Sequence, residues 1–222
     1  MKVKMITILK QALKKTFIFD LVIWFRRYSS NMTEIKFQSQ SNIYYHSPIH
    51  DLIKTIAFEN SIKIFFETGT YLGNTVFEVK DFFEEVYSVE LSEQLSKLAR
   101  KRFAGDTHVR ILNEDSSTAL HAFIKILEQP ALFWLDAHYS AGITAKGKVQ
   151  TPVRDELRSI LSHPLKRHFI LIDDVKDFNG ENDYPTVAEI LDMVQEYGAD
   201  AYEAKVQGDV FMIYPLQSPI VA

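Results

Sequence analysis

Short apolar runs alternate with helical patterns along this chain. The first run, 62–66, leads into an acid and a glycine turn, and the segment from Thr75 to Phe83 then carries apolar side chains three or four residues apart. A short, mostly apolar run predicts a buried strand, and the wider spacing predicts an amphipathic helix. The opening unit of the core is therefore a strand, a glycine turn and a helix.

The alternation continues along the sequence. Four further buried strands are expected, at 86–90, 109–112, 131–135 and 168–172, with helical patterns between them. One of these helices is expected to begin with Ser92 as its N-cap, and a further helix is expected at 186–197, after the fifth strand. A helix also precedes the first strand, because Ser47 suits an N-cap and Pro48 suits a first helical turn. The last two strands, 201–206 and 210–214, are close enough in sequence to form a hairpin.

Five strands that alternate with helices predict an α/β fold, in which a mostly parallel, doubly wound sheet has helices on both faces. The hairpin brings the sheet to seven strands and makes its C-terminal part antiparallel. In such a sheet, ligands bind at the carboxyl ends of the strands. Acids follow these strand ends, namely Glu67, Glu90, Asp115, Asp136, Asp173 and Asp174. So many acids on one rim predict a functional site there.

The composition is that of a soluble globular protein. The chain has 222 residues, of which 46% are hydrophobic and 24% are charged, which is enough for one sizeable core. It has no cysteine, which excludes a disulfide framework, thiolate metal ligands and a cysteine nucleophile. The formal net charge of −4 gives no reason to expect nucleic acid as a partner.

The charge is unevenly distributed, because residues 1–28 hold seven Lys and Arg against one Asp. Apolar residues in this segment fall on one helical stripe, so a basic amphipathic helix and a linker are expected at 1–46, ahead of a domain at 47–222. The apolar run 17–25 is too short to span a bilayer. Two alternatives stay open for a cytoplasmic protein: a helix at the inner face of the membrane, or one packed on its own domain or on a second copy.

The glycine turn is suited to ligand binding. Gly69 lets a ligand approach the backbone closely, and Gly73 permits either close helix packing or a left-handed φ. The turn lacks the Gly-x-Gly-x-x-Gly pattern of dinucleotide-binding proteins. Glu67 beside it suits a cationic ligand group, such as an ammonium, better than a phosphate.

Acids on the next two strands suit a nucleoside. Glu90 follows the glycine turn by about twenty residues, which is the position of the acid that accepts ribose hydroxyls in dinucleotide folds. Its alternative role is an acidic cap near Ser92. Asp115 and Ser116 lie one strand further along the chain. They are placed either to contact an adenine edge or, in the case of Asp115, to cap the following helix.

The segment from Glu67 to Thr75 resembles the first motif of class I S-adenosylmethionine-dependent methyltransferases, and the resemblance covers roughly residues 47–215. Tyr71, in place of a middle glycine, is similar to the catechol-type O-methyltransferases. The resemblance implies a Rossmann-like sheet that binds S-adenosylmethionine, with Glu67 near the methionine amino group, Glu90 at the ribose and Asp115 at the adenine. The cofactor-binding residues that it implies are Glu67, Gly69, Tyr71, Gly73, Thr75, Glu90, Asp115 and Ser116.

The resemblance also implies a metal site. In the catechol-type and macrocin-type enzymes, three acidic or amide groups at the ends of strands four and five hold Mg²⁺, and Asp136, Asp173 and Asp174 match those positions. Oxygen ligands suit Mg²⁺ or a similar divalent cation. Such a metal would lower the pKa of a bound hydroxyl and orient it for attack on the methyl group. The alternative is that Asp173 and Asp174 only start a turn.

The expected base departs from the family pattern. The catechol-type enzymes place a lysine very close after the fourth-strand acid, whereas this chain has His138 there. His138 is a candidate base at neutral pH, or a partner of the metal site. Lys146, in the following loop, is a second candidate, and both residues have purely structural alternatives. Together with Asp136 they form the predicted catalytic set.

The acceptor is inferred from a looser resemblance. The loop Tyr139–Gly147 and the Leu-Lys-Lys-Thr segment at 13–16 resemble uncharacterised bacterial methyltransferases of surface-polysaccharide gene clusters. This implies O-methylation of a sugar or another small diol. Two other function classes stay open: a non-catalytic nucleoside-binding module of a glycan-assembly complex, and an NAD-dependent oxidoreductase, which the missing dinucleotide pattern disfavours.

Overall fold

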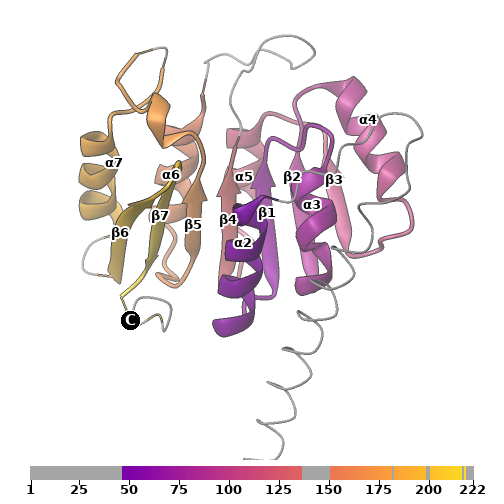
Figure 1. Cartoon of the computed structure of the whole chain (residues 1–222), viewed down its shortest axis with the longest axis horizontal. Coiled ribbons are helices and arrows are strands. Elements are labelled where there is room, and N and C mark those ends of the chain that lie inside the picture. Colours follow the sequence, from indigo (N-terminus) through magenta and orange to yellow (C-terminus); the bar gives the residue numbers. More distant parts are fainter. Residues whose placement is uncertain (1–46, 137–150, 182, 199–200, 217, 219–222) are drawn as a thin grey trace, which may run out of the picture. The chain divides into compact units, whose positions relative to one another are not determined.

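The computed structural model describes residues 47–136, 151–181, 183–198, 201–216 and 218. They form a sheet with the strand order β3-β2-β1-β4-β5-β7-β6 and helices on both faces (Figure 1). This confirms the predicted α/β architecture. The predicted N-terminal helix and linker, residues 1–46, lie outside the described residues, so their structure and role stay predictions.

Seven strands and six α-helices make up the described part of the chain. The strands are β1 Ile64–Thr68, β2 Glu85–Val89, β3 Val109–Leu112, β4 Ala131–Leu135, β5 Phe169–Ile172, β6 Tyr202–Gln207 and β7 Val210–Pro215. The α-helices are α2 Pro48–Glu59, α3 Asn74–Val79, α4 Glu93–Arg102, α5 Ser116–Ile124, α6 Val153–Leu161 and α7 Val187–Met193. Single 3-10 turns lie at Lys80–Phe82 and Val175–Asp177, and a π-helical segment, Val194–Gly198, follows α7.

Strand β1 lies at the centre of the sheet. It pairs in parallel with β2 on one side and with β4 on the other, so that Glu67 is opposite Ser88 and Trp134. From β1 the chain adds β2 and β3 in one direction, and from β4 it adds the remaining strands in the other direction. The topological switch point therefore lies between the carboxyl ends of β1 and β4, where ligands bind in open α/β sheets.

The sheet divides the hydrophobic core in two, because successive side chains of a strand point to opposite faces. On one face Phe66 and Phe133 pack with α5, α6 and α7. On the other face Phe65 and Trp134 pack with α2, α3 and α4. Every residue of β1 and β4 is buried, as expected for strands covered on both sides. This packing fixes the strand ends that carry the candidate site.

The predicted elements agree with the structure to within one or two residues at most ends. The first strand runs two residues further than predicted, because the ladder continues to Thr68, opposite Val89 and Leu135. The helix predicted from Thr75 to Phe83 divides into α3 and a 3-10 turn, and the one predicted at 186–197 divides into α7 and the π-helical segment. Ser47 is the N-cap of α2, as predicted.

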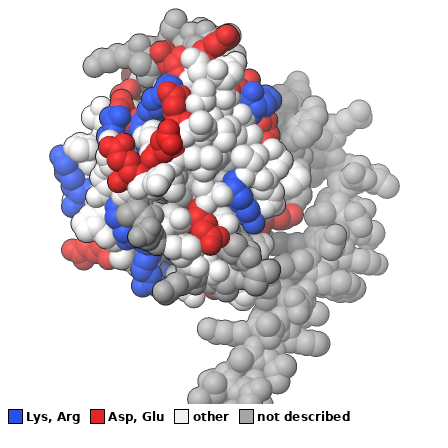
Figure 2. Space-filling view, turned by 90° about the vertical axis from the view of Figure 1, so that its left-hand side faces the viewer, with Lys and Arg blue, Asp and Glu red and all other residues white. Residues whose placement is uncertain are grey.

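Strand β6 is an edge of the sheet and carries charged side chains. Glu203 accepts a hydrogen bond from the Tyr214 hydroxyl at 3.2 Å, and Lys205 Nζ lies 5.6 Å from the centre of the same ring. Charges on an edge strand oppose pairing with another chain. On this side of the molecule Lys and Arg lie among Asp and Glu (Figure 2). The described helices include none that is long and apolar enough to cross a membrane.

Candidate functional site

The loop between β1 and α3 turns tightly at the edge of the sheet. The Gly69 N–H donates to the carbonyl of Val89 at 2.9 Å. Gly69, Tyr71 and Gly73 have positive φ values of 88°, 48° and 74°. At Gly73 a Cβ would lie 2.7 Å from Cε2 of Phe103, so both predicted reasons for this glycine apply: the left-handed φ and the close approach to a neighbouring ring.

Glu90 joins this loop to the start of α4. Its Oε2 accepts from the Tyr71 N–H and its Oε1 accepts from the Ser92 N–H, each at 2.8 Å. The residue is 6% exposed. Each carboxylate oxygen can accept a further hydrogen bond. The anchored carboxylate therefore offers two acceptors beside the glycine turn, an arrangement that can bind a pair of neighbouring hydroxyls.

Glu67 is a buried acid at the carboxyl end of β1. The hydroxyls of Ser88 and Thr75 hydrogen-bond to its carboxylate. Burial raises the pKa of Glu67 to about 8; the carboxylates of Asp136 and Glu90 add to this rise, and the two hydroxyls oppose it. The carboxyl is therefore largely protonated at neutral pH. A cationic ligand group placed beside it would favour the charged form and displace the proton.

Asp115 and Ser116 lie at the start of α5. Asp115 is the N-cap, and its Oδ1 accepts from both the N–H and the hydroxyl of Thr118, each at 3.1 Å. The Ser116 side chain hydrogen-bonds to Glu156. The capping alternative is therefore confirmed for Asp115. Contact of either residue with an adenine is untested and stays a prediction.

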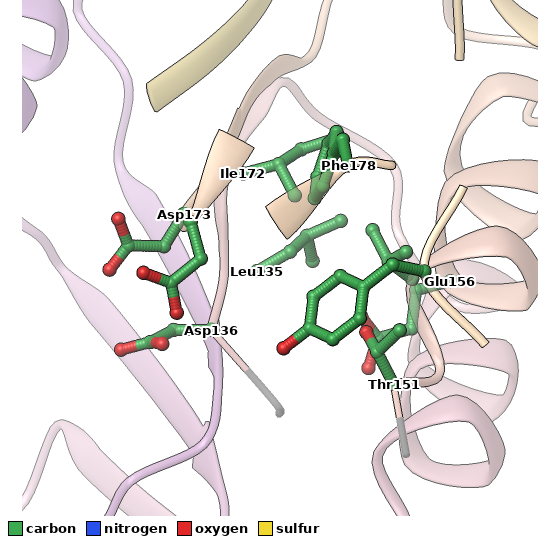
Figure 3. Close-up of a pocket in the computed structure, with 10 residues that line it drawn as sticks. Leu135, Asp136, Thr151, Glu156, Ile172, Asp173 and Phe178 are labelled. Carbon is green, nitrogen blue, oxygen red and sulfur yellow. The ribbon is translucent and has the colours of Figure 1, made fainter. Parts of the chain in front are cut away.

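A pocket lies at the ends of β4 and β5, beside the start of α6. Asp136 and Asp173 lie on one side of it, and Thr151 and Glu156 on the other (Figure 3). Burial raises the pKa of Asp173 to about 6, and the nearby Asp136 carboxylate adds to the rise. Acids from two neighbouring strand ends are thus brought together, as the parallel sheet predicted.

The predicted Mg²⁺ site gains no support from this geometry. Across residues 47–136 and the described residues from 151 onward, there is no group of three or more His, Asp or Glu side chains that could hold a metal ion. Asp174 has a φ of 57° and begins a 3-10 turn, and its carboxylate accepts from Lys176 at 2.7 Å. Lys176 also donates to Asp209 at 2.6 Å. Asp174 therefore has a lysine as its cationic partner. It also starts a turn, as the alternative to a metal site predicted.

The predicted base cannot be placed. His138 and Lys146 lie outside the described residues, so their catalytic role stays a prediction. Asp136, the third member of the predicted catalytic set, is described. Its N–H donates to the carbonyl oxygen of Thr68 at 3.1 Å, which fixes it directly after β4 and beside β1.

Sequence reasoning missed two residues near the pocket. Glu156 is 1% exposed and Thr68 is fully buried, and the Thr68 hydroxyl donates to Glu156 Oε2 at 3.4 Å. A signal for Glu156 was present in the helical spacing. It follows Val153 by three residues and precedes Ile160 by four, which puts an acid on the apolar face of an amphipathic helix.

Known structures with the same fold include O-methyltransferases, although no protein-family model and no curated protein matches the sequence. One is the O-methyltransferase of tomaymycin synthesis from Streptomyces achromogenes, in complex with SAM. It is 14% identical, with a TM-score of 0.58 over 77% of this chain and 80% of that one. Another is an O-methyltransferase from Bacillus cereus in complex with SAH, 15% identical, with a TM-score of 0.56 over 79% and 84%. At these identities the likeness shows a shared fold.

Proposed function

We propose that this chain is an S-adenosylmethionine-dependent methyltransferase that acts on a hydroxyl of a small acceptor, such as a sugar or another diol. The observation that carries the proposal is Glu90, whose carboxylate is anchored by the N–H groups of Tyr71 and Ser92. It offers two acceptors, as the two hydroxyls of a ribose require. The fold shared with O-methyltransferases that hold SAM or SAH supports the same nucleoside ligand.

Glu67 favours S-adenosylmethionine over a dinucleotide. S-adenosylmethionine carries an ammonium and a sulfonium group, and both are cations that a buried carboxylate stabilises. A pyrophosphate in the same position would oppose ionisation of this acid and would gain no charge attraction from it. The β1–α3 loop also lacks the glycine spacing that dinucleotides need. The hypothesis of an NAD-dependent oxidoreductase is therefore less well supported than that of a methyltransferase.

The proposed reaction is a direct transfer of the methyl group. The acceptor oxygen attacks the methyl carbon, the O–C bond forms while the S–C bond breaks, and the sulfur keeps the electron pair in S-adenosylhomocysteine. The hydroxyl proton passes to a base. The protein's contribution is to hold the two reactants in line. Asp136 and Asp173 line the pocket at the switch-point side of the sheet and are proposed to orient the acceptor hydroxyls.

Calorimetry with S-adenosylhomocysteine tests the ligand. Glu90→Ala should weaken binding by about 1.5–3 kcal/mol, the range for a hydrogen bond to a charged group. Glu93→Ala is the matched control, because Glu93 is an exposed acid nearby that pairs with Lys97. Unchanged affinity of a folded Glu90→Ala variant, or tighter binding of NAD than of S-adenosylhomocysteine by the wild type, would contradict the proposal.

A screen of nucleotide sugars and catechols with radiolabelled S-adenosylmethionine separates an enzyme from a non-catalytic nucleoside-binding module. Methyl transfer to any of these acceptors supports the enzyme. Ligand binding without transfer to sugars, catechols or other hydroxyl compounds favours the module. Asp136→Asn should slow transfer without weakening the binding of S-adenosylhomocysteine, since Asp136 lies at the pocket and not at Glu90, and its carboxylate opposes ionisation of Glu67. Metal assistance is tested in the same assay, because a metal-assisted reaction would stop in a chelator and resume with Mg²⁺.

A membrane contact through residues 1–28 is proposed from their basic charge and their apolar helical stripe. The full chain should sediment with anionic vesicles, less so at high salt, because exposed charges are screened within about 10 Å at 0.1 M. Deleting residues 1–28 should abolish the binding. Absence of binding by the full chain would favour the alternative, in which this segment packs on its own domain or on a second copy.

A further inference from the structure

Glu156 is a buried acid to which neither the sequence pattern nor the proposed reaction gives a role. It lies in α6 and is 1% exposed. One carboxylate oxygen, Oε2, accepts from the Thr68 hydroxyl at 3.4 Å, and the Ser116 hydroxyl also hydrogen-bonds to the carboxylate. The side chain lines the pocket on the side opposite Asp136 (Figure 3).

The two partners of Glu156 belong to different parts of the sheet edge. Thr68 is the last residue of β1, directly before the glycine turn, and its Oγ1 lies 3.3 Å from the Asp136 N–H. Ser116 is the first residue of α5. Through these two hydroxyls, Glu156 connects α6 to the strand end that begins the glycine turn and to the helix start on the adenine side of the proposed site.

Stability alone does not account for an acid at this position. Burial raises the pKa of Glu156 to about 8, against the two hydroxyls, which favour its charged form. Its other oxygen, Oε1, is buried and has no hydrogen-bond partner among the described residues. A buried carboxyl with an unsatisfied oxygen is costly, and an apolar residue of similar volume often stabilises such a site. The helix would pack better with an apolar residue there.

We propose that Glu156 is a positioning residue that holds the end of β1 and the start of α5 in the geometry that binds the nucleoside ligand. The inference rests on the proposed function for the identity of that ligand. Glu156 does not contact the ligand itself; it fixes the hydroxyls of Thr68 and Ser116. Without it, the glycine turn and the first turn of α5 would sample a wider range of relative positions, and the ligand would have to order them on binding.

The test compares Glu156→Leu and Glu156→Gln with wild type, by calorimetry with S-adenosylhomocysteine and by thermal unfolding. Glu156→Leu should lose about tenfold or more in affinity while its melting temperature stays the same or rises. Glu156→Gln keeps an oxygen and a similar shape, so it should restore affinity to within about threefold of wild type. Asp155→Asn is the matched control, because Asp155 is the neighbouring exposed acid and pairs with Arg158.

Two outcomes would overturn the inference. One is wild-type affinity in a folded Glu156→Leu variant. The other is an affinity loss that is equal in both variants and matched by a fall in melting temperature, since a purely structural residue would behave in that way.

Hydrogen exchange of the ligand-free protein keeps this test separate from the proposed function. Glu156→Leu should speed exchange at the Asp136 amide and in the first turn of α5, and Glu156→Gln should not. Unchanged exchange in the Leu variant contradicts positioning whatever the ligand is. A wild type that fails to bind S-adenosylhomocysteine contradicts the proposed function, while faster exchange in the Leu variant would still support the positioning.

Discussion

The two ends of the central strands bury polar side chains in different ways. At the amino ends of β4 and β5, His168 is fully buried. Its Nδ1 accepts from the Ala131 N–H at 3.2 Å, and its Nε2 lies 2.9 Å from Nδ1 of His163. The backbone N–H of His168 donates to the Tyr202 hydroxyl at 3.3 Å. Each polar atom of the ring has a partner, and burial lowers the pKa of His168 to about 3. The neutral ring is a structural element.

At the carboxyl ends, the buried polar groups include acids. Glu67 and Glu156 are both 1% exposed, and burial raises the pKa of each to about 8. Glu156 has an oxygen without a described partner, and Glu90 keeps two free acceptor positions beside the backbone donors that anchor it. Glu156 and Glu90 are therefore held in place without having all their hydrogen-bonding capacity used by described residues.

The difference separates structure from function on a single sheet. Buried polar groups that serve only the fold are expected to be fully hydrogen-bonded. Groups that bind a ligand must leave some hydrogen-bond donors or acceptors unpaired in the ligand-free protein, which lowers its stability. His168 at the amino ends follows the first rule, and Glu156 and Glu90 at the carboxyl ends follow the second. This contrast supports the proposed ligand site at the carboxyl ends without using any resemblance to known enzymes.

The largest expected effect is on the pH dependence of stability. Glu67 and Glu156 have folded-state pKa values of about 8, above those of an unfolded chain, so their contribution is present at low pH and is lost as pH rises towards 8. Each of these two acids should lower the free energy of unfolding by up to about 1.4 kcal/mol for each pH unit by which the pH rises. His168 has the opposite sign, because its lowered pKa costs stability as pH falls below about 6.5. Urea denaturation between about pH 5 and about pH 8.5 covers both the unfolded histidine pKa and the raised pKa of the two acids. It therefore measures the effect of the acids and the effect of His168.

Matched variants show which end of the central strands causes each change of the unfolding free energy with pH. Glu67→Gln and Glu156→Gln should each reduce the loss of stability between about pH 6.5 and 8, whereas His168→Gln should leave that slope unchanged. If all three variants kept the wild-type slope, the buried acids at the carboxyl ends would not be protonated in the folded protein, and the contrast between the two ends would be wrong.

A second prediction concerns proton release on ligand binding. Because Glu67 is largely protonated near neutral pH, binding of the ammonium group of S-adenosylhomocysteine beside it should expel a proton. The affinity for S-adenosylhomocysteine should then increase as the pH is raised towards 8, by up to about tenfold per pH unit. Calorimetry in buffers with different ionisation enthalpies counts the protons released. Glu67→Gln should bind more weakly and show no such pH dependence, and an equal proton release in this variant would move the titrating group elsewhere.

The smallest expected effect lies at the amino ends. His168→Gln should lower the free energy of unfolding by about 1 kcal/mol, the net value of one hydrogen bond, without changing the affinity for S-adenosylhomocysteine. His121→Gln, in an exposed position of α5, is the control and should change neither quantity. A clear loss of ligand affinity in His168→Gln would mean that the two ends of the sheet are coupled, contrary to the division proposed above.

The sequence was informative wherever a pattern had one physical cause. Helix starts at Ser47 and Ser92, the glycine at position 73 and the row of acids at the strand ends were all predicted, because caps, positive φ and parallel strands leave local signals. Glu156 was missed because its partners, Thr68 and Ser116, are distant in sequence, and the apolar spacing of α6 concealed one acid. The lysine beside Asp174 was present two residues away, but only the turn of the backbone shows that it pairs with that acid.

The position of β7 determines the order in which the last strands can join the sheet. Within the described sheet β6 pairs with β7 alone, and β7 lies between β6 and β5. Tyr202–Gln207 can therefore join the sheet only through Val210–Pro215, the strand that follows it in the chain. Until Val210–Pro215 follows, the exposed edge is β5, whose four residues are all buried in the folded protein. A folding intermediate in which β7 has not yet paired with β5 therefore exposes an apolar edge strand, and such an edge is prone to aggregation.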